Sequence, residues 1–181
     1  DLRRVDSILR QAVVVRKLYD NIVSYLSSLF SSGSMTEEQA TQTAGMMYIL
    51  SDIERTDALC TEATESLQSI LEKKHKLSPE AVEDLCQGLQ IIEDMYQNVL
   101  EVIRTGNGED ARKIVHKKDN VLDLTLKLRK NHMKRVKQGA CDAEMTSDFT
   151  RILHSFDRIG NSCANIADAA LTGVSFESVL K

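Results

Sequence analysis

The chain has 181 residues, of which 42% are hydrophobic, and its formal net charge is −4 at pH 7. That is enough apolar material for one core, or for two small repeats that share a core. With one proline, eight glycines and no tryptophan, the sequence lacks the turn residues of a β-sandwich and favours long helices.

The cysteines lie far apart and form no Cys-x-x-Cys pair; they are Cys60, Cys86, Cys141 and Cys163. Their spacing argues against a zinc ribbon or a disulfide framework and is typical of a reducing cytosol. No apolar stretch approaches the roughly 18 to 20 residues that span a bilayer, and no signal peptide is evident. Because the sequence opens with Asp1 inside a helical pattern, we expect a fragment of a longer protein.

Apolar spacing of three and four residues predicts a first helix over about residues 2–30, which Ser31 to Gly33 ends. Thr36 and Gln39 form a capping box that opens a second helix, reaching about residue 71. Ser78 and Pro79 are typical of a helix start, so they predict a third.

The third helix should continue past residue 102 to a break at residues 106–108, Gly-Asn-Gly. A fourth is predicted over about residues 109–137, stopping at Gly139, and a fifth over about 142–171, closed by Gly173. Long helices joined by short loops pack as antiparallel neighbours. The predicted fold class is therefore all-α, an antiparallel bundle of about five long helices.

Residues 51–57 and 154–161 both carry an apolar–acid–Arg pattern, which indicates two related three-helix repeats. We expect an incomplete first repeat over residues 1–77, a second over 78–173 and a tail over 174–181. The first repeat would lack its opening helix. Its exposed apolar face predicts a homodimer that covers it.

Charge is unevenly placed. Residues 35–103 contain 14 acids and four bases, whereas residues 109–139 contain four acids and ten bases. A basic fourth helix is compatible with a phosphate, membrane or protein partner, and equally with internal pairing and solvated faces. No aromatic residue interleaves with the basic run, which argues against nucleic acid.

Polar pairs at i, i+4 mark a candidate metal site. Asp119 and Asp123 share a face of the fourth helix, and Asp157 and Asn161 share a stripe of the fifth that extends to Asp168. Two antiparallel helices that each present such a pair can hold a multivalent cation. His116, one turn before the fourth-helix pair, adds a nitrogen donor. The alternative is that these acids are solvated.

The run Phe156 to Asp168 resembles the PhoU family motif L-E-R-I-G-D-H-A-x-N-I-A-E, and residues 119–123 resemble its E/D-x-x-x-D motif. The string from Leu128 to Cys141 is similar to L-R-x-x-H-x-x-R…G-x-C in the PhoU-like tail of sodium/phosphate cotransporters. Residues 22–26 resemble the I-x-x-Y-L of the same group. The likeness covers nearly the whole chain.

PhoU proteins bind iron or zinc clusters through paired acidic motifs. The resemblance implies Asp119, Asp123 and Asp157 as ligands of iron or zinc in the second repeat, with Asn161 replacing an aspartate and lowering the charge. In the first repeat the corresponding positions are Ala12 and Arg16 on one helix, and Glu54 and Ala58 on the other. We expect no metal site there.

The resemblance further implies a PhoU-like regulatory domain that modulates phosphate uptake and is not an enzyme. It would lie on the cytoplasmic side of the plasma membrane, attached to the membrane part of a bacterial phosphate cotransporter, which is its expected partner. One alternative is a stand-alone PhoU-type phosphate-signalling regulator. A carboxylate-bridged bundle enzyme is a weaker alternative, because the Glu-x-x-His pairs of such sites are lacking.

Overall fold

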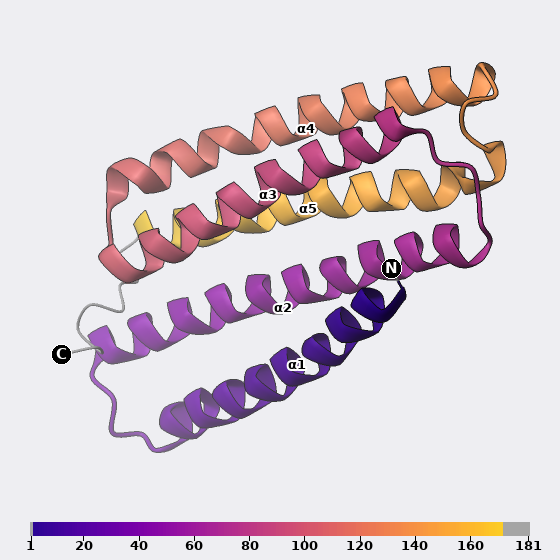
Figure 1. Ribbon diagram of the computed structural model, residues 1–181. Helices are drawn as coiled ribbons and strands as arrows, with labels where there is room; N and C mark the ends of the chain where they lie inside the picture. Colours follow the sequence, from indigo (N-terminus) through magenta and orange to yellow (C-terminus); the bar gives the residue numbers. More distant parts are fainter. Residues whose placement is uncertain (1, 172–181) are drawn as a thin grey trace.

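The computed structural model describes residues 2–171, in which successive long helices run in opposite directions (Figure 1). The elements are α1 (Leu2–Ser31), α2 (Glu37–Glu72), α3 (Pro79–Thr105), α4 (Gly108–Lys137), a short 3-10 turn η1 (Ala143–Met145) and α5 (Thr146–Leu171). This confirms the all-α prediction for the described residues. No helix among them is long and apolar enough to cross a membrane.

Local side-chain caps start α2 and α3 where the sequence predicts. The Thr36 hydroxyl accepts a hydrogen bond from the Gln39 amide at 3.2 Å, and the Gln39 side chain accepts one from the Thr36 amide at 2.9 Å. Ser78 caps α3 by accepting from the Ala81 amide at 3.2 Å, with Pro79 as the first helical residue. Both caps satisfy amides that the first helical turn leaves without partners.

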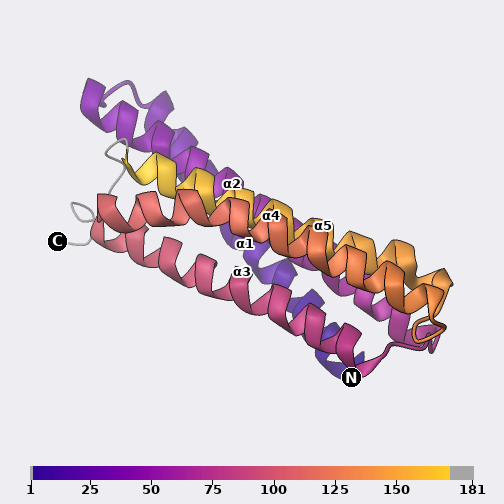
Figure 2. The ribbon, with the colours of Figure 1, turned by 90° about the horizontal axis from the view of Figure 1, so that it is seen from above.

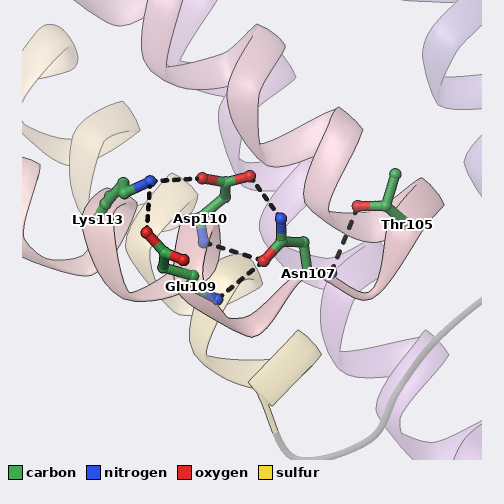
Figure 3. A network of polar contacts seen from close by, with 5 residues as sticks. All are labelled: Thr105, Asn107, Glu109, Asp110 and Lys113. Carbon is green, nitrogen blue, oxygen red and sulfur yellow. Dashed lines mark hydrogen bonds and ion pairs between the residues drawn. The ribbon is translucent and has the colours of Figure 1, made fainter.

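A tight turn reverses the chain between α3 and α4. Gly106 has a φ of 67°, a left-handed conformation that favours glycine. The Asn107 side-chain oxygen then accepts from the amides of Glu109 and Asp110, at 3.0 and 3.4 Å. Lys113 bridges the same two acids at 3.1 and 3.0 Å, and these contacts fix the start of α4 (Figure 3).

The fifth helix begins later than predicted. Residues 143–145 form the turn η1, and α5 starts at Thr146 rather than near residue 142. The Asp142 side chain makes no cap; it accepts a hydrogen bond from the Lys76 amide at 2.6 Å. Asp142 therefore contacts the loop after α2 instead of capping α5. The predicted stop at Gly173 and the tail over 174–181 lie outside the described residues.

The core surrounds α5, which packs against α2, α3 and α4. Two glycines allow close approach. A Cβ on Gly88 of α3 would lie 2.7 Å from the ring of Phe156, and a Cβ on Gly160 would lie 3.2 Å from Val121 of α4. Figure 2 shows α4 and α5 running close together along the bundle. The small Gly160 therefore lets α4 come close to α5.

Helix α1 lies at the edge of the bundle and packs mainly against α2 (Figure 1). Only Val5 and Leu26 of α1 are buried. Large apolar side chains spaced by three, four or seven residues remain 42–64% exposed; these include Leu18, Ile22 and Tyr25. Such spacing places them on one stripe of the helix, and an apolar stripe of this length is typical of a surface that another helix covers.

We therefore expect the purified chain to dimerise through the α1 stripe. Replacing Leu18 and Tyr25 together by lysine should give a monomer, because two like charges would face the partner at the contact. Light scattering coupled to size exclusion measures the mass directly. The control is Ser24→Lys, a lysine at an exposed polar position of α1, which should leave the dimer intact. A single-chain mass for the unchanged protein at high concentration would contradict the expectation.

Candidate functional site

The acidic pair of α4 lies on the outer surface of the bundle. Val121, between the two acids, is fully buried and faces Gly160 of α5. An α-helix turns by about 100° per residue, so Asp119 and Asp123 lie roughly 200° around the helix from Val121. Both are exposed. The two carboxylates share a face, as predicted, but that face is turned away from α5.

The side chains of Asp157 and Asn161 on α5 are also not arranged as two metal ligands would be. Asp157 is half-buried and Asn161 is exposed. The Asn161 amide group donates to the main-chain oxygen of Asp157 at 3.0 Å, so the asparagine is engaged by its own helix. Asp168 and His116, the two additional candidates, are both exposed.

The structure does not assemble the predicted donors into one ligand set. Among residues 2–171, no group of three or more histidine, cysteine, aspartate or glutamate side chains lies close enough to hold a metal ion. Iron and zinc in protein sites require three or four convergent donors. As they lie, Asp119, Asp123 and Asp157 do not fit such a centre, and metal binding in the second repeat stays a prediction.

Between α1 and α2, an arginine side chain pairs with an acid at the positions of the other acidic motif. Arg16 of α1 forms an ion pair with Glu54 of α2, at the positions where the family resemblance places metal ligands. Asp57 lies one turn further along α2. Burial raises the pKa of the Asp57 carboxyl, the Arg16 guanidinium opposes this shift, and Glu54 adds to it. Arg16 thus joins α1 to α2 at a place where two acids of α2, Glu54 and Asp57, lie near each other.

A buried polar contact that the sequence did not predict joins the two halves of the bundle. Asp52 of α2 is 3% exposed and accepts a hydrogen bond from the Asn165 side chain of α5 at 3.4 Å. Burial raises the pKa of the nearby Cys163 thiol to about 12, with a further contribution from Asp52. The apolar–acid–Arg repeat contains Asp52, but its partner lies 113 residues away.

The string from Leu128 to Cys141 is used inside the fold. Leu128 is fully buried, and Arg135 forms a 2.7 Å ion pair with Asp84 of α3, with both side chains largely shielded. Gly139 adopts a φ of 66°, and its carbonyl oxygen accepts from the Lys76 ammonium at 2.9 Å. The string therefore ties the end of α4 to α3 and to the loop after α2.

His132 is the most enclosed titratable group of this string. Its ring stacks on Phe149 with centroids 4.1 Å apart, and its Nε2 lies 3.2 Å from the Thr146 hydroxyl. The Nδ1 atom is buried without a hydrogen-bond partner. Burial lowers the pKa of His132, and the positive charge of Arg135 lowers it further. Both effects favour the neutral form of the imidazole.

One comparison with known families bears directly on this arrangement. The family model of the PhoU domain matches residues 85–170. Residues 85–170 form a PhoU-like domain. Among curated proteins, none matches the chain.

The PhoU-like domain covers most of α3 and all of α4 and η1, and it ends one residue before the end of α5. The acidic motifs at residues 119–123 and 157–161 both lie inside it. Helices α1 and α2 lie outside it, so their assignment to an incomplete first repeat stays a prediction. The close contacts at Gly88 and Gly160 both join helices of the PhoU-like domain.

From the outward direction of Asp119 and Asp123, we expect the purified chain to retain much less than one equivalent of iron or zinc. The measurement is elemental analysis after incubation with either metal and desalting. The Asp123→Asn variant and a control, Glu65→Gln, at an exposed acid of α2, run beside it. Near-stoichiometric metal that is lost only in Asp123→Asn would contradict this expectation and show that the predicted ligands converge in solution.

The buried His132 should make the stability of the PhoU-like domain depend on acid. Because folding lowers the pKa of this histidine below its usual value of 6.5, its contribution is complete above about pH 6.5 and is lost as the pH falls through the folded pKa. The loss amounts to at most about 1.4 kcal/mol per pH unit. Thermal unfolding between pH 8 and pH 5 measures it.

His132→Phe keeps an aromatic ring against Phe149 and should flatten this part of the pH profile. The control is His154→Gln, because His154 is exposed, and it should leave the profile unchanged. An unchanged profile in His132→Phe would show that other groups cause the acid sensitivity.

Proposed function

We propose that the chain is a regulatory domain that modulates sodium-dependent phosphate uptake through protein contacts and carries out no catalysis itself. In this proposal it lies on the cytoplasmic side of the plasma membrane and acts on the membrane part of a phosphate cotransporter. The observation that carries the proposal is the PhoU-like domain over residues 85–170, which indicates a phosphate-related regulatory role.

The resemblance of residues 128–141 and 22–26 to cotransporter tails supports the transporter context. In the structure, His132 and Arg135 of the first string face the interior. The residues shared with cotransporter tails therefore include ones that pack the end of α4 against α3 and α5. The contact with a transporter would use other, exposed residues.

Metal is not required by this proposal. Arg16 already neutralises Glu54 in the first half, and Arg135 neutralises Asp84 in the second. These two acids thus have side-chain partners within the chain, and iron or zinc bound at Asp119, Asp123 and Asp157 would act on the domain in addition to the protein contacts.

The test is phosphate uptake in the bacterium that encodes the chain. Gly160→Leu places a bulky side chain against Val121, which should destabilise the domain by about 1–3 kcal/mol or more. We expect uptake of labelled phosphate in sodium buffer to lose its dependence on external phosphate, whereas uptake in potassium buffer stays unchanged. The control is Ala44→Leu, at an exposed position of α2, which should behave as the unchanged protein.

Unchanged uptake in both buffers with Gly160→Leu, in cells where the domain is shown to be unfolded, would contradict the proposal. A change that appears equally in sodium and in potassium, together with altered expression of phosphate-starvation genes, would favour the stand-alone PhoU-type regulator.

A further inference from the structure

The second half of α4 presents a run of positive charge to solvent. Residues 126–137 contain six basic residues and no acidic one. Arg135 is the one turned inward, where it pairs with Asp84. The other five are exposed and form no ion pair with any acid of the described chain; they are Lys127, Arg129, Lys130, Lys134 and Lys137. We call these five residues the α4 basic face.

The helix dipole explains the position of only some of the basic residues on this face. Basic side chains in the last turn of a helix favour its dipole, and Lys134, Arg135 and Lys137 occupy that turn of α4. The effect falls off within one turn. Lys127 and Lys130 lie further back along the helix, so their accumulation calls for another cause.

Large apolar side chains stand on the same outer surface. Leu122, Leu126 and Met133 are 44%, 51% and 42% exposed. Their spacing of four and seven residues keeps them on one stripe. A shallow groove of about 540 Å³ passes between Met133 and four of the lysines and is lined by Lys127, Lys130, Asn131, Met133, Lys134 and Lys137. Apolar and basic groups therefore alternate over one open surface.

From this arrangement we infer that the α4 basic face docks on an anionic membrane surface. Lysine side chains can extend their stems along apolar neighbours while the ammonium groups reach lipid phosphates. Leu126 and Met133 would enter the boundary between headgroups and acyl chains, as apolar residues of interfacial helices do. Figure 1 shows α4 along the outer edge of the bundle, where no other helix of the described chain obstructs its outer side.

A membrane fits this surface better than nucleic acid does. Residues 109–139 contain no phenylalanine, tyrosine or tryptophan on which a base could stack, and the His132 ring is buried against Phe149. Exposed leucine and methionine gain nothing from a phosphodiester backbone, whereas they gain free energy by leaving water at a lipid surface.

The experiment is co-sedimentation of the purified chain with vesicles of phosphatidylglycerol and phosphatidylcholine, or of phosphatidylcholine alone. We expect binding to the anionic vesicles only. Lys127→Gln, Lys130→Gln and Lys134→Gln together should weaken it about 100-fold. The matched control removes the same charge from exposed positions of α1, with Arg4→Gln, Arg10→Gln and Lys17→Gln, and should weaken it far less.

A second variant, Leu126→Ser with Met133→Ser, keeps every charge and should weaken binding about tenfold or more if these side chains enter the bilayer. Circular dichroism checks that each variant is folded. Equal loss in the α1 control, equal binding to neutral vesicles, or no binding at all would overturn the inference. So would release by inorganic phosphate at matched ionic strength, or binding of single-stranded RNA without vesicles.

This inference does not depend on the proposed function, because vesicle binding uses the purified chain and phosphate uptake uses cells. Loss of vesicle binding with normal regulation of uptake, or the reverse, would separate the two.

Discussion

The close contact of α5 with its neighbours is the constraint on which the rest of the bundle depends. Two glycines make it possible, since side chains at positions 88 and 160 would meet Phe156 and Val121 at 2.7 and 3.2 Å. With these contacts made, α5 is buried by α2, α3 and α4 together. Helix α1 has no share in this core and is held through α2, with the Arg16–Glu54 ion pair among its few polar contacts. The molecule therefore has a tightly packed core around α5 and an outer helix, α1, that is attached from one side.

Features that depend on short stretches of sequence could be predicted, and features that depend on distant partners could not. The starts of α2 and α3 were predicted because their caps join residues three apart, such as Thr36 with Gln39. The predicted start of α5 was wrong because the Asp142 side chain accepts a hydrogen bond from the Lys76 amide, 66 residues away, instead of capping the helix. Spacing correctly placed Asp119 and Asp123 on one face. Only the burial of Val121 between them reveals that this face is the outer one.

Three acids in the interior each have a side-chain partner from another helix. Asp52 accepts from Asn165, Asp84 pairs with Arg135, and Asp148 accepts from the Ser69 hydroxyl at 2.7 Å. An unpaired buried charge is costly, so these partners are needed wherever an acid lies between helices. Satisfied acids do not need a metal for their stability. Of the acids in the metal-binding motifs, Glu54 pairs with Arg16, whereas Asp119 and Asp123 are exposed.

The exposed apolar side chains of α1 and the unpaired basic side chains of α4, by contrast, lie at the two edges of the bundle. Helices α1 and α4, which carry the apolar stripe and the basic face, lie at opposite edges of the bundle, with α2 and α5 between them (Figure 1). Any coupling between a partner at α1 and a surface at α4 has to pass through α2 and α5, because these two helices alone link the edges through well-packed contacts in the described chain. The buried Asp52–Asn165 contact lies at that link. A shift of α2 that breaks this bond would leave the buried Asp52 carboxylate with Arg55 of the same helix, 3.6 Å away, as its remaining partner, and would cost the free energy of the lost hydrogen bond. That cost couples the position of α2 to the position of α5, and through these two helices it relates the α1 surface to the α4 surface.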